Sequence, residues 1–267
     1  MSKSAFERMQ LIKNIARPNI DQYVSALFED FIELHGDRAY GDDPAVLGGI
    51  GTIGGKAVTV IGHRKGNSTE ENIRYNFGMP HPEGYRKSIR LMQQAEKFGR
   101  PVIFFVDTPG AYCGVGAEER GQGHAIAQSI QQLMFLKTPV LTIITGEGGS
   151  GGALAMAVAD KIYMLENAVY SVISPRGFAS ILWKDPSKEE QAAELLKMTA
   201  PDLLSFGVID GIVPEPKGGA HTDPARTCIE LRQVIEKELE DFSFLGTKTL
   251  LENRYRKFRG MGVFASN

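Results

Sequence analysis

Five glycines and a serine lie within residues 146–152, directly after an apolar run at 139–145 and before the small residues 153–158. This order predicts a buried strand, a glycine turn and the start of a helix. The first backbone N–H groups of a helix have no intrahelical partner, and the helix dipole adds partial positive charge there. We therefore expect the turn to hold negative charge.

Three kinds of negatively charged group fit this stretch of sequence. Gly146, Gly148 and Gly151 match the dinucleotide fingerprint, which would hold a phosphate. Ser150 between glycines matches the nucleophile elbow of a serine hydrolase, for which His221 is the only downstream histidine. The third kind is an enolate or another oxyanion formed during a reaction. An alternative without chemistry is that the glycines let a strand pack closely against a helix.

The elements that position this turn are repeated along the chain. Residues 101–110 and 139–148 follow one pattern 38 positions apart: an apolar strand, a turn with glycine and then a helix. Two such units, with strands apolar on both faces, predict a parallel sheet covered by helices. The two glycine turns should lie at the same carboxyl edge of that sheet and share one ligand site.

The remaining pattern predicts one domain over residues 1–267. Apolar side chains recur at helical spacing through residues 1–35, which we predict to be helical. Residues 46–61 alternate about a pair of glycines and predict a β-hairpin. Helices are also predicted over residues 84–98 and, as a long amphipathic segment, over about 224–242.

Composition and charge exclude several classes of protein. The chain has 267 residues with a formal net charge of −2, which gives no reason to expect nucleic acid or an anionic membrane as a partner. No apolar run is long enough to span a bilayer, and the N-terminus lacks the apolar core of a signal peptide. The two cysteines, Cys113 and Cys228, have no metal-ligand spacing. We expect a cytoplasmic protein without a metal site.

Longer strings identify a family that this chain resembles. They match, in order, the carboxyltransferase alpha subunit of bacterial acetyl-CoA carboxylase, from about residue 17 to residue 256. The strings are GDRAY (36–40), NFGMP (76–80), PEGYRK (82–87), DTPGAY (107–112), GVGAEERGQ (114–122), GEGGSGGALA (146–155) and PEPKGGAH (214–221).

This resemblance implies an α/β crotonase-like fold, a superhelix of repeated ββα units with helices packed around a mostly parallel sheet. It also implies a heterotetramer of two alpha and two beta subunits, with a four-cysteine zinc ribbon on the beta subunit. The substrates would be acetyl-CoA and carboxybiotin on the biotin carboxyl carrier protein, with biotin carboxylase in the full complex. No cofactor would be bound covalently by this chain, and the product would be malonyl-CoA.

The resemblance also implies roles for the glycine turns. Carboxyl transfer develops negative charge on the ureido oxygen of biotin, and the family's alpha subunit holds it with backbone N–H groups. The matching positions are Gly151 and Gly152, with Ala153 included in case the register differs by one. Residues expected to contact substrate are Gly110, Ala111, Gly114, Val115, Gly116, Gly148 and Gly149. We expect Asp107 to cap its own turn rather than to take part in catalysis.

Three positions depart from the pattern expected for the family. Position 113 is cysteine instead of proline, and position 178 is phenylalanine instead of a small residue. Position 176 is arginine where glutamate is expected, which reverses the charge. A contact that the glutamate makes in the family would therefore be lost or changed here.

Overall fold

A computed structural model describes residues 3–262, so residues 1–2 and 263–267 of the predicted single domain lie outside the described part. An eight-stranded sheet runs through the centre. Its strands are β1 (Glu29–Glu33), β2 (Val46–Ile53), β3 (Lys56–His63), β4 (Val102–Thr108), β5 (Val140–Gly149), β6 (Lys161–Leu165), β7 (Val169–Ser171) and β8 (Gly211–Val213). No helix among residues 3–262 has the length and apolar character that crossing a membrane requires.

The sheet has an antiparallel part and a parallel part. Its strand order is β1-β2-β3-β4-β5-β6-β8, and β7 pairs with β5 beside this path. The pairs β1–β2 and β2–β3 are antiparallel, whereas all pairs from β3 to β8 are parallel. The predicted hairpin is formed by β2 and β3. The predicted α/β class with a mostly parallel sheet is therefore confirmed.

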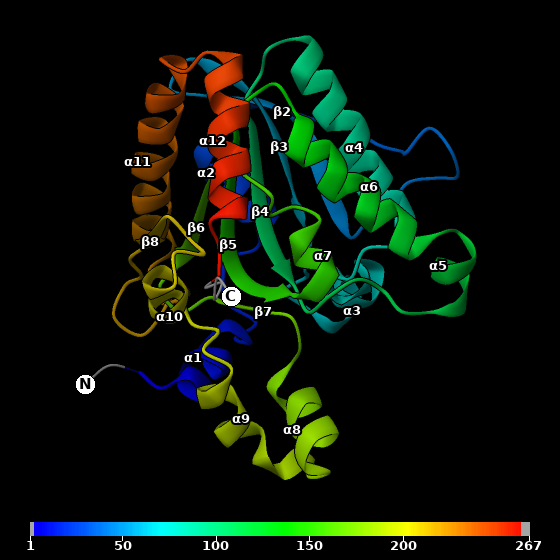
Figure 1. The fold of residues 1–267 in the computed structure, drawn as a ribbon, viewed down its shortest axis with the longest axis vertical. Coiled ribbons are helices and arrows are strands. Elements are labelled where there is room, and N and C mark those ends of the chain that lie inside the picture. Colours follow the sequence, from blue (N-terminus) through cyan, green and yellow to red (C-terminus); the bar gives the residue numbers. More distant parts are fainter. Residues whose placement is uncertain (1–2, 263–267) are drawn as a thin grey trace, which may run out of the picture.

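Helices cover both faces of this sheet (Figure 1). In chain order they are α1 (Ala5–Ile12), α2 (Ile20–Leu27), α3 (Thr69–Arg74), η1 (Asn76–Gly78), α4 (Pro82–Lys97), α5 (Val115–Glu119), α6 (Gln122–Phe135), α7 (Ser150–Leu154), α8 (Pro175–Trp183), η2 (Pro186–Lys188), α9 (Glu189–Leu195), α10 (Ala200–Ser205), α11 (Pro224–Ser243) and α12 (Thr247–Arg259). One face is covered by α4 and α6, which pack against each other, and α12 lies against α6. On the other face α2 packs on β1 and β2, with α11 beside it.

Apolar side chains of the central strands make the core between these layers. Tyr23 of α2 stacks on Phe105 of β4, with ring centroids 5.7 Å apart, and Phe28 meets the same ring edge-on. All three side chains are buried. Aromatic pairs of this kind add about 0.5–1.5 kcal/mol to the stabilisation from burial. They hold the N-terminal helices against the strand that leads to the first glycine turn.

The prediction of helix over residues 1–35 was wrong in part. The chain forms two short helices, α1 and α2, and residues 29–33 form β1, which pairs with β2 as an edge strand. The second helix is capped by Asn19 and ends at Phe28, whose backbone is extended. Pairing with the open edge of the hairpin outweighs the helical spacing of the apolar residues.

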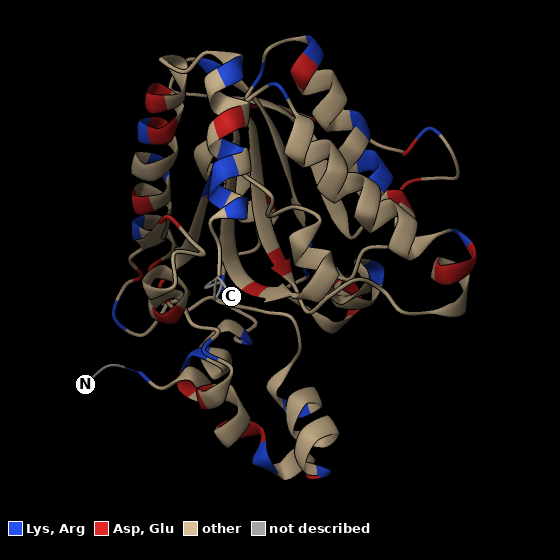
Figure 2. Cartoon of the chain, viewed as in Figure 1, with Lys and Arg blue, Asp and Glu red and all other residues tan. Residues whose placement is uncertain are grey.

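The glycine run also differs from its prediction. Strand β5 continues through Gly149, so that Gly146 and Gly148 belong to the strand and the turn is confined to the start of α7. Beyond this turn, α8 and α9 project from the body of the molecule (Figure 1). Figure 2 shows few charged residues on α8. The predicted long C-terminal helix corresponds to α11.

Candidate functional site

Two turns meet at the carboxyl ends of the neighbouring strands β4 and β5. A Cβ added to Gly149 would lie 2.2 Å from the carbonyl oxygen of Pro109. One added to Gly152 would lie 2.7 Å from the carbonyl carbon of Gly110 and from the amide nitrogen of Ala111. Only glycine allows two backbones to approach this closely. The prediction that the two turns lie together at one sheet edge is confirmed.

Helix α7 starts at the point where these turns touch. Its first three residues are Ser150, Gly151 and Gly152, whose N–H groups have no intrahelical acceptor because the helix begins there. The N–H of Ala153 is the first that can pair within the helix, with the carbonyl of Gly149. Gly151 is half-buried and Gly152 is buried. The two glycines therefore meet the first requirement for backbone donors to an oxyanion, whereas Ala153 does not.

Ser150 has an unusual backbone at this position. Its φ is +48°, in the left-handed region that favours glycine, and its side chain is exposed. It lies between two cavities, of about 200 and 280 Å³. A conformation of this kind costs about 1–3 kcal/mol for a residue other than glycine and is found most often at functional sites.

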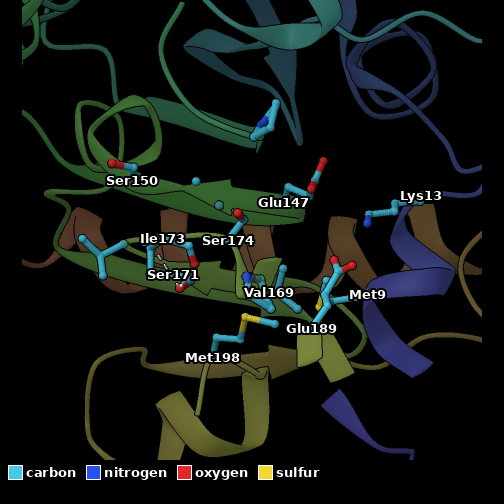
Figure 3. A pocket seen from close by; sticks show the side chains of 15 residues that line it. Met9, Lys13, Glu147, Ser150, Val169, Ser171, Ile173, Ser174, Glu189 and Met198 are labelled. Carbon is cyan, nitrogen blue, oxygen red and sulfur yellow. Dashed lines mark hydrogen bonds between the residues drawn. The ribbon is translucent and has the colours of Figure 1, made fainter. Parts of the chain in front are cut away.

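The first of these cavities combines apolar walls with backbone polar groups (Figure 3). Met9 of α1, Val169 of β7 and Met198 supply apolar surface, and the backbone from Gly148 to Ser150 forms one side. Lys13, Glu147 and Glu189 are the charged residues that line it. The cavity suits a small, mostly neutral ring system that needs a few fixed polar contacts.

A cluster of charges lies beside the turn, where Figure 2 shows acidic residues near the carboxyl ends of two central strands. The ammonium of Lys65 lies 2.7 Å from Oδ1 of Asp107 and 2.8 Å from Oε2 of Glu147. Burial alone would lower the pKa of Lys65, but the two carboxylates raise it above its ordinary value. The lysine is therefore charged at neutral pH.

Asp107 does not cap its own turn, so that prediction was wrong. Its Oδ1 accepts a hydrogen bond of 2.9 Å from the backbone N–H of Glu147, on the neighbouring strand. The turn after β4 is closed instead by Thr108, whose hydroxyl oxygen accepts from the N–H of Gly110 at 3.0 Å. Asp107 is held away from its own turn by Lys65 and by the N–H of Glu147, whereas Thr108, the last residue of β4, bonds within the turn.

Two further polar groups beside the cluster are buried. His63, at the end of β3, is 2 % exposed; its ring lies close to the backbone of Gly152, and neither ring nitrogen has a hydrogen-bond partner within 3.5 Å among the described residues. Burial lowers the pKa of His63 to about 3, so the ring is neutral at physiological pH. Arg17 forms a buried ion pair with Glu215 at 2.7 Å. Burial alone would raise the pKa of Glu215, but hydrogen bonds from Arg17 lower it to about 2.

The sequence pattern did not predict the roles of Arg17, His63, Lys65 and Glu147. They come from three separate segments, with His63 and Lys65 in the same one, and are assembled only by the sheet. The available signal was their position: His63 and Lys65 close a predicted strand, and Glu147 stands inside the glycine run. Polar residues at the carboxyl ends of neighbouring strands are candidates for a site in an open parallel sheet.

Part of the predicted substrate-contact set lies away from the cavities beside the turn. Of this set, Gly148 and Gly149 line them. Gly110 and Ala111 do not, and neither do Gly114, Val115 and Gly116. These three residues belong to the exposed start of α5, where the side chain of Val115 is 76 % exposed. Their contact with substrate stays a prediction.

The departures from the family pattern occupy surface or near-surface positions. Cys113 is exposed in the loop before α5, and Arg176 is exposed in the first turn of α8. Phe178 packs edge-on against Trp183 within α8, with ring centroids 5.5 Å apart. The structure gives no physical account of the change at position 113.

The alternative of a serine hydrolase is not supported. Ser150 makes no side-chain hydrogen bond to His221 among the described residues, and His221 lines neither of the cavities beside Ser150. Within residues 3–262, no group of three or more histidine, cysteine, aspartate or glutamate side chains is arranged to hold a metal ion.

Solved structures that match this fold include a transcarboxylase and a subunit of an acyl-CoA carboxylase. Transcarboxylase 12S superposes with a TM-score of 0.71 at 17 % identity, covering 88 % of this chain and 44 % of that one. The beta subunit of geranyl-CoA carboxylase from P. aeruginosa gives 0.68 at 18 % identity, covering 92 % and 46 %. The chain therefore shares the fold of these two enzymes, the α/β crotonase-like fold that its sequence predicted.

Within that class, the chain belongs to the family described as acetyl co-enzyme A carboxylase carboxyltransferase-like, which matches residues 2–262. Curated relatives are named acetyl-coenzyme A carboxylase carboxyl transferase subunit alpha. The protein from Carboxydothermus hydrogenoformans is 58 % identical over 96 % of this chain and 80 % of its own length. The protein from Clostridium perfringens is 56 % identical over 96 % of this chain and 95 % of its own length. The protein from Thermus thermophilus is 55 % identical over 97 % of this chain and 82 % of its own length.

Proposed function

We propose that this chain is the alpha subunit of an acetyl-CoA carboxylase carboxyltransferase. It moves the carboxyl group of carboxybiotin to acetyl-CoA and so produces malonyl-CoA, the first committed step of fatty acid synthesis. Family membership over residues 2–262 and relatives of 55–58 % identity that bear this name support the proposal. At the site, the observation that carries it is the backbone contact between the turns at Gly110 and Gly152.

The N–H groups of Gly151 and Gly152 hold the ureido oxygen of biotin as negative charge develops on it. Bound carboxybiotin supplies the carboxyl group and a ring nitrogen that takes the α-proton of the thioester. The chain then needs donors rather than a side-chain base, and donors fixed by packing need no reorganisation during the reaction. The dipole at the start of α7 adds to the stabilisation of the anion.

The cavity beside Ser150 fits the ring system of biotin. Its volume of about 200 Å³ and its apolar walls, which include Val169, Ile173 and Met198, suit a neutral fused ring with one polar edge. The backbone from Gly148 to Ser150 borders the same cavity, next to the proposed donors. Both substrates are delivered from outside this chain, and no covalently bound cofactor is part of the proposal.

The thioester site lies on a partner subunit. The relatives are alpha subunits by name, which implies a beta subunit. We propose that this partner carries a zinc ribbon and forms a heterotetramer of two alpha and two beta chains. The biotin carboxyl carrier protein brings carboxybiotin, and biotin carboxylase completes the assembly in the cytoplasm. Three exposed apolar side chains, Val172 in the cavity wall and Ile181 and Leu182 on α8, support a protein interface.

Reconstitution tests this proposal. The chain, the beta subunit encoded in the same genome and their mixture are each incubated with acetyl-CoA and carboxylated carrier protein, and malonyl-CoA is measured by mass spectrometry. We expect product from the mixture alone. A purified alpha–beta complex that forms no malonyl-CoA would show that the proposal is wrong.

A further inference from the structure

The strand that leads to the glycine turn contains a bulge just before it. Between the pairs Val106↔Ile144 and Thr108↔Gly148, β4 advances by two residues and β5 by four. At the same place β5 changes neighbours: it pairs with β6 up to Ile144 and with β7 from Glu147. Figure 1 shows β5 bending at this end. Bulges next to active sites redirect the chain that follows.

Side chains from other elements, rather than a regular ladder, hold the bulge. The guanidinium of Arg17 donates two hydrogen bonds to the carbonyl of Thr145, at 3.0 and 2.7 Å. Oδ1 of Asp107 accepts from the N–H of Glu147 at 2.9 Å. The backbones of Thr145 and Glu147, on either side of Gly146, are therefore each held by a charged side chain from another segment.

The two charged groups are themselves held in place. Arg17 is paired with Glu215, and both side chains are almost fully buried. Asp107 is paired with Lys65 and its side chain is 17 % exposed. Hydrogen bonds to charged groups are stronger than those between neutral groups, so these contacts can determine the path of a short segment.

Gly146 fits this arrangement because the carboxylate occupies the space that a side chain would need. A Cβ there would lie 2.5 Å from Oδ1 of Asp107. The role of Gly146 is therefore to let Asp107 reach the backbone of β5. Gly146 thus differs in function from Gly151 and Gly152, the proposed backbone donors.

We infer that Asp107 and Arg17 are positioning residues for carboxyl transfer, because they hold the β5 bulge that places the Gly149–Gly152 turn against Gly110. This inference rests on the proposed function for its effect on rate. Asp107 and Arg17 are not catalytic residues in this inference, because their side chains hydrogen-bond to the backbone of residues 145 and 147.

The opposite end of β5 offers a matched control. Oδ2 of Asp160 accepts from the N–H of Val140 at 2.8 Å, and Asp160 is paired with the buried Arg254. The chemistry is the same as at Asp107, a paired carboxylate on a backbone amide of the same strand. Asp160 is paired with an arginine instead of a lysine and lies at the end of β5 far from the glycine turn.

The experiment compares Asp107→Ala, Asp107→Asn and Asp160→Asn in the alpha–beta complex, with kcat per folded complex as the first measurement. Misplacement of reacting groups by about 1 Å costs about 100-fold in rate, so we expect a loss of that order in Asp107→Ala. Asp107→Asn keeps an oxygen for the amide of Glu147 and should recover most of the activity. We expect the KM for acetyl-CoA to stay unchanged throughout and Asp160→Asn to keep the wild-type kcat.

Amide hydrogen exchange tests the inference without the reaction. Asp107→Ala, or Asp107→Ser if the alanine variant does not fold, should speed exchange at residues 148–152, and Asp160→Asn should not. Wild-type kcat in Asp107→Ala, unchanged exchange in the Asp107 variant, or equal losses in the Asp107 and Asp160 variants would overturn the inference. Failure of the proposed function is recognised separately, because the wild-type complex would then make no malonyl-CoA.

Discussion

Gly152 lies directly against Gly110, so closely that a Cβ on Gly152 would be 2.7 Å from the carbonyl carbon of Gly110. The two residues are more than forty positions apart in the chain and belong to turns after different strands. Their contact brings the start of α7 onto the first turn. The proposed oxyanion donors thus depend on two backbones that touch without side chains between them.

Replacing Gly152 by alanine should therefore abolish most carboxyl transfer. The added methyl group cannot be accommodated by backbone atoms, and the donor N–H groups must move with the turn. We expect a loss of about 100- to 1000-fold in kcat, the cost of one oxyanion donor in other enzymes. Gly123→Ala is the control, because a Cβ on Gly123 of α6 meets nothing within 4 Å. Full activity in Gly152→Ala would contradict the assignment.

Two substitutions of Ser150 distinguish the role of its hydroxyl from that of its backbone. Ser150→Ala should keep carboxyl transfer, and the wild-type protein should not be labelled by a fluorophosphonate. Ser150→Gly should be more stable by about 1 kcal/mol, because glycine adopts a φ of +48° without strain. Urea unfolding measures the second effect and malonyl-CoA formation the first. Labelling that disappears in Ser150→Ala would favour the hydrolase instead.

The buried histidine predicts a dependence of stability on pH. The unfolded chain binds a proton on His63 below its ordinary pKa of 6.5, whereas the folded protein does so only near pH 3. The free energy of unfolding should therefore fall as the pH falls through this window, by up to about 1.4 kcal/mol per pH unit for this one group.

Urea unfolding between pH 7 and pH 5 measures this slope, above the range in which most carboxylates titrate. His63→Phe should flatten it. His124→Gln, at an exposed position of α6, controls for the loss of a histidine as such. An unchanged slope in His63→Phe would mean that another group is responsible.

The attachment of α12 depends on one buried arginine. Arg254 is 1 % exposed and donates to the carbonyls of Leu133, Leu136 and Thr138 as well as to Asp160. Arg254→Met leaves Asp160 charged and unpaired, so we expect a loss of about 3–5 kcal/mol in the free energy of unfolding.

Arg256→Met is the surface control for that variant. Arg256 pairs with Glu252 on the exposed side of α12, and such pairs contribute less than about 1 kcal/mol. Urea unfolding compares both variants with the wild type. Equal losses in the two would show that the buried network contributes no more than a surface pair.

The elements and the class of site followed from local patterns. The hairpin, the apolar strands and the glycine-rich helix start are encoded in short stretches, because alternation, glycine pairs and apolar runs act over a few residues. The 38-residue repeat also placed the two turns at one edge, since parallel strands share their carboxyl ends. Residues 29–33 could not be placed in this way, because they pair with a strand edge whose position is not local.

By itself, then, the sequence determined the α/β class, the family and the glycine pair at the start of α7. Tertiary structure alone decided that Asp107 bonds to β5 rather than to its own turn, and that Arg17, His63 and Lys65 gather beside that turn. The physical reason is reach: a hydrogen bond or an ion pair depends on a separation of about 3 Å in space. Residues far apart in the chain come that close only after the sheet and its bulge have formed.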